Sequence, residues 1–298
     1  MKIGYFPGCS LHATAREFDE SLRAIAPTLD LDLTEIEDWA CCGATSAHAT
    51  NHLLSIALPA RTLALAEAQQ HQQVLAPCAA CYNRLATAHH QVAKDAALAQ
   101  KVNKVLERPF NNTVAVRSIA QILHELIPTI KSKVKTPLKD LKVACYYGCL
   151  LVRPPHLDNS DDAEQPHSLE EIVTATGATS VNWHKRLDCC GGGFSISRTD
   201  SVIRLSRAII DDAAAAGADA IVVGCPMCQS NLDLRQRAMK RADSPIPILY
   251  ITQLVGLALA LSPKNLGLNR HFINTKAVSD RKFSNDTDVA KSAAGGQS

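Results

Sequence analysis

Short apolar runs alternate with longer helical patterns along most of the chain. In the first half, apolar and β-branched runs predict strands at Ile3–Phe6, Leu31–Ile36 and Val74–Ala76. In the second half, the same places are taken by Val143–Tyr146, Ser180–Trp183 and Ala220–Val223. Helical patterns lie between the strands, for example at residues 52–70 and at 201–216, where Gly217 ends the pattern. Strands that alternate with helices favour a parallel sheet with crossover helices, so an α/β fold is expected.

The longest apolar run, Ile248 to Leu261, is interrupted by Thr252 and Gln253. It is too short to span a bilayer, so we expect a packed helix there and no membrane span. The first residues of the chain lack the long apolar stretch and small-residue cleavage site of a signal peptide. The expected location is therefore the cytoplasm.

The two halves of the chain repeat one cysteine pattern. Residues 2–9 match residues 142–149, and the segment at 119–123 matches the one at 251–255. In each half a single cysteine is followed after 31 or 39 residues by Cys-Cys-Gly, and after a further 35 or 34 residues by C-x-x-C. Ten of the 11 cysteines obey this pattern, and Cys145 is left over.

The repeats predict the domain organisation. Each is expected to be a small parallel sheet with crossover helices, at residues 1–130 and 141–262, joined by a basic linker at 131–140. The acidic, proline-rich stretch at 154–166 is predicted to be a surface loop. Residues 263–298 are expected to form a polar, disordered tail, because the sequence from about Thr275 has too little apolar content to pack.

The net charge and the number of cysteines limit the classes of function that the chain could have. The formal net charge is +2, which gives no electrostatic case for binding nucleic acid. Disulfides are rare in a reducing compartment, so 11 cysteines indicate metal binding or redox chemistry. Scattered buried cysteines that act as small hydrophobes are the alternative, but random scatter does not produce a repeated spacing.

Each repeat offers five thiols near one predicted sheet edge, because ligand sites in open α/β sheets gather at the carboxyl ends of strands. A structural zinc ion and an ordinary [4Fe–4S] cubane both take four ligands. Either one cysteine per repeat is spare, or the centre is larger or less regular than a cubane. The glycines after the vicinal cysteines, Gly43 and Gly191, allow the sharp turn that would aim two adjacent sulfurs at one centre.

These motifs resemble the CCG domain of the B subunit of heterodisulfide reductase, over roughly residues 1–260. The resemblance implies two noncubane [4Fe–4S] clusters that face each other and cleave or form a disulfide between them. It also implies the ligands, which are Cys9, Cys41, Cys42, Cys78 and Cys81 in the first repeat, and Cys149, Cys189, Cys190, Cys225 and Cys228 in the second.

The same resemblance implies partners. In this family the B subunit works with a C subunit that carries cubane clusters and with an A subunit that is a flavoprotein. The opening segment Tyr5 to His12 is similar to the forms of bacterial sulfur oxidisers, which are associated with lipoate-binding carrier proteins. CCG domains also occur in subunits of some succinate and glycolate oxidoreductases. Those carry fused ferredoxin-like motifs, and no C-x₂-C-x₂-C run is present in this chain.

Four charged residues near the first cysteine of each repeat are candidates for substrate binding: His12, Arg16, Arg153 and His156. They could line a pocket or bind an anionic tail, and the alternative is that they are solvated or cap helices. Cys145 is expected to be a buried thiol outside the ligand sets. Trp39 and Trp183 precede the vicinal pairs and could either shield a centre or pack in the core.

Physical chemistry supports a paired site. Cleaving a disulfide takes two electrons, whereas iron–sulfur clusters pass electrons singly, so two adjacent centres would suit the reaction. The paired sites thus favour a disulfide-handling subunit, and the resemblance implies a role in sulfur-compound oxidation. An electron-transfer module whose clusters never touch substrate, and a zinc-stabilised scaffold, are the rival functions.

Overall fold

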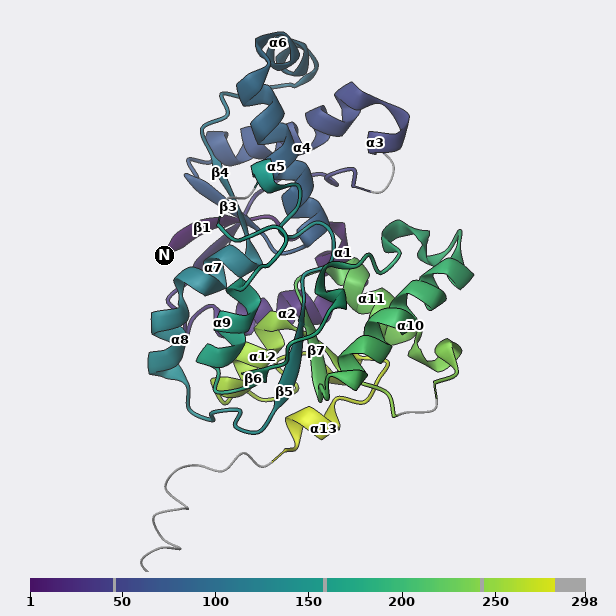
Figure 1. Cartoon of the computed structure of the whole chain (residues 1–298). Helices are drawn as coiled ribbons and strands as arrows, with labels where there is room; N and C mark the ends of the chain where they lie inside the picture. The colour runs from purple at the N-terminus through teal and green to yellow at the C-terminus, as the bar shows by residue number, and fades with distance from the viewer. Residues whose placement is uncertain (45–46, 158–159, 242–243, 282–298) are drawn as a thin grey trace, which may run out of the picture.

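The computed structural model describes residues 1–44, 47–157, 160–241 and 244–281. It contains two four-stranded parallel sheets, one in each repeat (Figure 1). The strand orders are β2-β1-β3-β4 and β6-β5-β7-β8, so the two repeats share one topology. The α/β fold with two repeated parallel sheets, predicted from the sequence, is confirmed.

The strands are short. In the first sheet they are β1 (Lys2–Tyr5), β2 (Asp32–Glu35), β3 (Gln73–Ala76) and β4 (Ala115–Ser118). In the second sheet they are β5 (Lys142–Tyr146), β6 (Thr179–Ser180), β7 (Ala220–Val223) and β8 (Ile248–Tyr250). Every residue of β7 is buried, whereas β2 at the edge of its sheet alternates between exposed and half-buried positions. Apolar runs therefore mark the central strands, which helices cover on both faces.

Crossover helices follow the strands. The first repeat contains α1 (Gly8–His12), α2 (Arg16–Ile25), α3 (Ala47–Thr50), α4 (His52–Ala68), α5 (Ala79–Lys94), α6 (Ala96–Val105), α7 (Ile119–Glu125) and α8 (Ile127–Lys133). The second contains α9 (Ser168–Ala175), α10 (Thr199–Ala215), α11 (Pro226–Leu234), α12 (Ile251–Ala258) and α13 (Lys276–Ser279). Short 3₁₀ turns lie at Pro155–Leu157, Lys185–Leu187, Gly192–Ser195, Gln236–Met239 and Leu268–Arg270.

Three sequence expectations need correction. The strands β4 and β8 were not predicted, and Ile248–Tyr250 is a strand rather than the start of a helix over the whole apolar run. The expected linker begins inside α8, which continues to Lys133. Apolar content alone does not separate a buried strand of three residues from the helix that follows it, because both are covered on all sides.

The two repeats pack through equivalent helices. α2 contacts α12, and α7 contacts α9; in the repeat alignment α2 corresponds to α9 and α7 to α12. At the first of these contacts, the rings of Phe18 and Tyr250 stack with centroids 4.1 Å apart, and the hydroxyls of Ser21 and Thr252 share a buried 2.6 Å hydrogen bond. The junction therefore has an approximate internal twofold symmetry, and its core is aromatic.

The segment 263–281 is folded, contrary to the predicted polar tail. Its apolar residues Leu266, Leu268 and Val278 are buried. Asp233 of α11 is fully buried and accepts hydrogen bonds from the backbone N–H groups of Phe272 (2.7 Å) and Ile273 (3.1 Å). Three buried apolar side chains and the buried carboxylate of Asp233 therefore hold in place a segment whose composition is otherwise polar. Residues 282–298 of the predicted tail lie outside the described residues.

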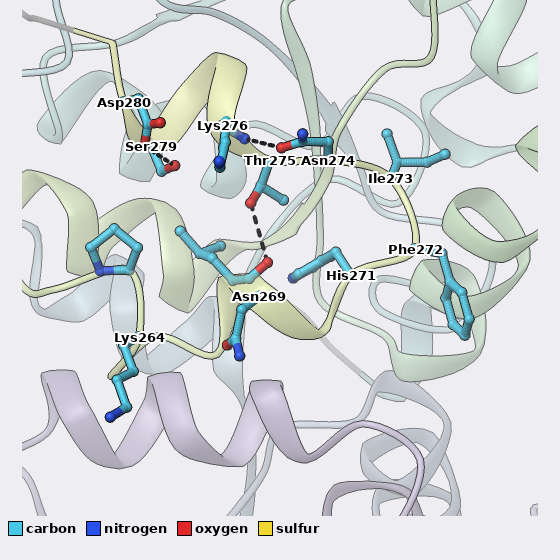
Figure 2. A pocket seen from close by; sticks show the side chains of 12 residues that line it. Lys264, Asn269, His271, Phe272, Ile273, Asn274, Thr275, Lys276, Ser279 and Asp280 are labelled. Carbon is cyan, nitrogen blue, oxygen red and sulfur yellow. Dashed lines mark hydrogen bonds between the residues drawn. The ribbon is translucent and has the colours of Figure 1, made fainter.

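This C-terminal segment surrounds a pocket of about 520 Å³ (Figure 2). Its lining includes Lys264, Asn269 and Lys276, and the side chain of Thr275 donates a hydrogen bond to the carbonyl of Leu268 across the loop. No cysteine lines the pocket. Among the described residues, no helix combines the length and apolar character that crossing a bilayer requires.

Candidate metal centres

The ten patterned cysteines follow the carboxyl ends of six strands. In each repeat, the single cysteine comes after the first strand, the vicinal pair after the second, and C-x-x-C after the third. Because the strands of each sheet are parallel, these three loops meet at one edge of the sheet. Parallel topology thus brings cysteines that are distant in the sequence into one site per repeat.

In the first repeat, two pairs of sulfurs lie close together. The Sγ atoms of Cys42 and Cys81 are 3.3 Å apart, and those of Cys9 and Cys41 are 4.0 Å apart. Cys78 also interacts with Cys81, so the five thiols form one group of three and one pair. The hydrogen bond between Cys42 and Cys81 lowers the pKa of Cys42 to about 7, which favours the thiolate that metals bind.

The second repeat has the same arrangement. The Sγ atoms of Cys190 and Cys228 are 3.5 Å apart, and Cys149 hydrogen-bonds to Cys189. This hydrogen bond from Cys149 lowers the pKa of Cys189 to about 6. The equivalent pairs in the first repeat are Cys42–Cys81 and Cys9–Cys41. The geometry of the sulfurs therefore repeats along with the sequence pattern.

The two sites meet at the start of the helices that carry C-x-x-C. The side chains of Cys78 and Cys225 interact across the repeats, and Cys228 interacts with Cys225. Beside them, the backbone N–H of Ala79 donates to the carbonyl of Gly224, at 3.3 Å. Both Cys78 and Cys225 are buried. A continuous path of sulfur contacts thus joins the two cysteine groups across the junction.

Backbone amides support the vicinal pairs. The N–H of Gly43 donates to the sulfur of Cys41 at 3.5 Å, and the N–H of Gly191 donates to that of Cys189 at 3.4 Å. The amide of Asn231, which is buried on α11, donates to the sulfur of Cys190 at 3.6 Å and to the carbonyl of Gly192 at 3.1 Å. Such hydrogen bonds favour the thiolate and are typical of the surroundings of iron–sulfur clusters.

The donor chemistry fits an iron–sulfur cluster in each repeat. Two thiolates on one tetrahedral metal lie about 3.8 Å apart for a metal–sulfur bond of about 2.3 Å, and the sulfur pairs in the two repeats lie 3.3 to 4.0 Å apart. Within the described part of the chain, no three Cys, His, Asp or Glu side chains converge as around a single metal ion. Five sulfurs exceed the four ligands of one tetrahedral ion and suit a centre with several metal atoms.

The four predicted substrate residues are not gathered at one point. His12 pairs with Glu35 (3.0 Å), and Arg16 is exposed at the start of α2. Arg153 pairs with Glu164 (2.6 Å) in the acidic loop, and the ring of His156 lies 4.7 Å from that of His90. Among the described residues, none of the four hydrogen-bonds to a cysteine, and their role in substrate binding stays a prediction.

Cys145 lies in the core. It is completely buried on β5 beside Val222 of β7, and burial raises the pKa of its thiol well above the usual value. Trp183 is also buried and donates from its indole N–H to the carbonyl of Cys145 at 3.1 Å. The ring of Trp39 packs edge-to-face against the rings of Phe6 and His12. Both tryptophans therefore pack beside the cysteine loops, one inside the core and one at its margin.

Sequence reasoning missed the polar residues that follow C-x-x-C. Asn231 lies three residues after Cys228, and Arg84 lies three residues after Cys81. Asn83 donates from its amide to the carbonyl of Arg153 at 2.8 Å, which links the two repeats. The signal that could have found Arg84 and Asn231 is helical spacing, because residues three apart on a helix share a face with the preceding cysteine.

Comparison with known proteins is consistent with this geometry. The chain matches the sequence profile of CCG, the Cysteine-rich domain, twice, at residues 3–86 and 143–233. It is 39% identical over 279 residues to the 8-methylmenaquinol:fumarate reductase membrane anchor subunit of Wolinella succinogenes, which covers 92% of this chain and 97% of that protein. It is 32% identical over 283 residues to the B subunit of the ferredoxin:CoB-CoM heterodisulfide reductase of Methanosarcina mazei, with 91% and 94% covered.

Among solved structures, a hypothetical protein from Helicobacter pylori has a similar fold, with a TM-score of 0.69 and 12% identity. The match covers 91% of this chain and 51% of that one, so the chain spans about half the length of that structure. With two CCG domains that occupy more than half of its length, and with relatives of this identity over nearly all of it, the chain belongs to the CCG family that includes the B subunit of heterodisulfide reductase.

Proposed function

We propose that this protein is the iron–sulfur subunit of a heterodisulfide reductase-like complex, which cleaves or forms a disulfide at the junction of its two repeats. The proposed ligands are the ten patterned cysteines, five for each of two noncubane [4Fe–4S] clusters. Family membership and relatives named as reductase subunits support an iron–sulfur oxidoreductase subunit. We also propose that the two repeats extend over residues 1–130 and 141–262.

The observation that carries the proposal is the contact between the two sites. Cys78 and Cys225 meet across the repeats, so any centre held by one repeat adjoins the centre held by the other. When bound, an iron–sulfur cluster accepts and donates single electrons. Cleaving a disulfide needs two electrons, and at this junction the centre of each repeat would supply one of them.

The chain controls which sulfurs a substrate could reach. Cys9, Cys41 and Cys189 are exposed and Cys149 is half-buried, whereas the cysteines of both C-x-x-C motifs are buried. A disulfide approaching from solvent would therefore meet the single cysteine and the first cysteine of the vicinal pair before the others. The buried C-x-x-C pairs would exclude water from the contact between the repeats.

The proposed partners are those that the sequence resemblance implies. A subunit with cubane clusters and a flavoprotein subunit would deliver or remove electrons, and a lipoate-binding carrier protein would present the disulfide. The opening segment at residues 5–12, which is similar to the sulfur-oxidising forms, supports lipoate as the substrate.

Metal and sulfide analysis of anaerobically purified protein tests the proposal. We expect about eight irons with matching acid-labile sulfide per chain, or roughly four of each in each repeat. Stoichiometric zinc without sulfide would overturn it. Anaerobic mixing with lipoamide or with a small mixed disulfide, followed by electron paramagnetic resonance, should then give a new signal.

A second function is favoured by one comparison. The fumarate reductase relative is 39% identical, and its name describes a quinol-linked enzyme. In that case the protein would be an electron-transfer module without direct substrate contact. If no thiol or disulfide perturbs either site while a partner subunit exchanges electrons with both, this second function is the correct one.

Alanine substitution of Gly8 should reduce iron binding by the first repeat. Gly8 has φ +68°, and a Cβ atom there would lie 2.8 Å from the sulfur of Cys81. The substitution therefore adds a steric clash with a proposed ligand to a backbone cost of about 1–2 kcal/mol. We expect Gly8→Ala to lose most of the first-repeat iron in the same metal analysis.

Gly217→Ala is the matched control for this prediction. Gly217 also has a positive φ of +75°, but apart from its chain neighbours no atom of the described residues lies within 4 Å of the position that a Cβ would occupy. It should retain all of its iron. Equal iron content in the two variants would show that the close approach at Gly8 is not needed for metal binding.

A further inference from the structure

One helical position differs in charge between the two repeats. Arg84 lies three residues after Cys81 on α5, and Asn231 lies three residues after Cys228 on α11. The two residues are equivalent in the repeat alignment. Because side chains three apart on a helix lie on one face, both should reach the site that the preceding cysteine faces.

The contacts of Asn231 show where this position points. Its amide donates to the sulfur of Cys190 (3.6 Å), to the carbonyl of Cys190 (3.3 Å) and to the carbonyl of Gly192 (3.1 Å). Cys190 is the second cysteine of the vicinal pair, and it also lies 3.5 Å from Cys228. A side chain at this position thus contacts Cys190, the buried cysteine of the vicinal pair, and the backbone that follows it.

Arg84 occupies the same position in the first site. Cys42 is equivalent to Cys190, and its sulfur lies 3.3 Å from that of Cys81, one helical turn before Arg84. The guanidinium donates to the neutral amide oxygen of Asn83 at 2.8 Å. Cys81 and Arg84 lie three residues apart on α5 and therefore share one face of the helix. A cation therefore occupies the helical position at which the second repeat has a neutral amide.

A second difference has the same sign. Asp188 immediately precedes the vicinal pair of the second repeat, where the first repeat has Ala40. The carboxylate is half-exposed and pairs with Lys185 at 2.9 Å, so solvent and its partner weaken its field. The first repeat is thus the more positive at both positions.

We propose that Arg84 gives the first-repeat site a higher reduction potential than the second-repeat site, so that the first electron to arrive resides in the first repeat. This inference rests on the proposed iron–sulfur function. A nearby positive charge stabilises the reduced state, which carries one more negative charge than the oxidised state. The amide of Asn231 acts in the same direction on the second site, but with a partial charge instead of a full one. In this step, an external one-electron donor loses one electron and the first site gains it.

Redox titration of single-site proteins tests the inference. Cys190→Ser would leave the first site intact and Cys42→Ser the second, and each protein is titrated anaerobically with dithionite under electron paramagnetic resonance. At any potential between the two midpoints, we expect the ratio of reduced to oxidised sites to be at least tenfold higher for the first site. That ratio corresponds to about 59 mV for a one-electron couple.

Charge variants identify Arg84 as the cause. In the Cys190→Ser background, Arg84→Gln should lower the reduced-to-oxidised ratio of the first site several-fold, and Arg84→Lys should largely preserve it. In the Cys42→Ser background, Arg84→Gln should change nothing, and Asp188→Asn should raise the ratio of the second site. The last comparison does not depend on the folding of any Arg84 variant.

The outcomes separate the two proposals. Equal midpoints, a higher midpoint for the second site, or an Arg84→Gln protein with an unchanged midpoint would overturn the inference and leave the iron–sulfur function intact. Wild-type protein without iron and sulfide would overturn the proposed function itself.

Discussion

Cys42→Ser should lose about half of the bound iron and sulfide and retain the signal of the second repeat. Cys42 is buried, and its sulfur lies 3.3 Å from that of Cys81, so the site has no room for a replacement ligand from solvent. A serine hydroxyl is a poor substitute for the soft thiolate that iron–sulfur clusters require. Cys190→Ser should have the reciprocal effect, with loss of the second site and retention of the first.

Cys145→Ser is the matched control. Cys145 is completely buried but lies on β5 outside the cysteine loops, so its variant should keep all of its iron and both spectra. The measurement is iron and sulfide per chain, together with electron paramagnetic resonance of each variant. Loss of a signal in Cys145→Ser would mean that the second repeat uses a different ligand set.

Phe18→Ala should destabilise the protein by about 3–5 kcal/mol, the usual cost of removing a buried aromatic ring. Phe18 is fully buried in α2, and its ring stacks on Tyr250 of the other repeat with an interplanar angle of 8°. The substitution leaves a cavity at the centre of the junction. Urea unfolding followed by circular dichroism measures the loss.

Phe272→Ala is the control for this second prediction. The Phe272 side chain is 56% exposed, and the hydrogen bond to Asp233 comes from its backbone, so the alanine variant should change stability by no more than about 0.5 kcal/mol. If Phe18→Ala were as stable as Phe272→Ala, the stacked pair would not hold the repeats together.

The sequence predicted the α/β fold and the repeated sites because both depend on strong, local signals. Apolar runs such as Ala220–Val223 identify central strands. A cysteine pattern that occurs twice shows that the loops after these strands carry equivalent sites in the two repeats. The strand β8 was missed because Ile248–Tyr250 continues without a break into the apolar helix α12. Only hydrogen-bonding partners, which lie in distant segments, distinguish the two.

The folded C-terminal segment was missed for a related reason. Its packing depends on Asp233, which lies 39 residues before Phe272 in the chain, and on a few isolated apolar residues such as Leu266. The average apolar content of a segment does not reveal single buried residues of this kind. The unequal charges at Arg84 and Asn231 were likewise visible in the sequence, but only the contacts of Asn231 with Cys190 show that this position faces the sulfurs.

The stacked junction also sets an order of events during synthesis. The strands of the first sheet are complete at Ser118, whereas Tyr250, whose ring stacks on Phe18, lies at the end of the last strand, β8. At about 5–20 residues per second, the ribosome needs on the order of ten seconds to make the intervening chain. During that interval, the nascent first repeat presents an aromatic face without its partner, and this face is a target for chaperones and for premature association between neighbouring chains.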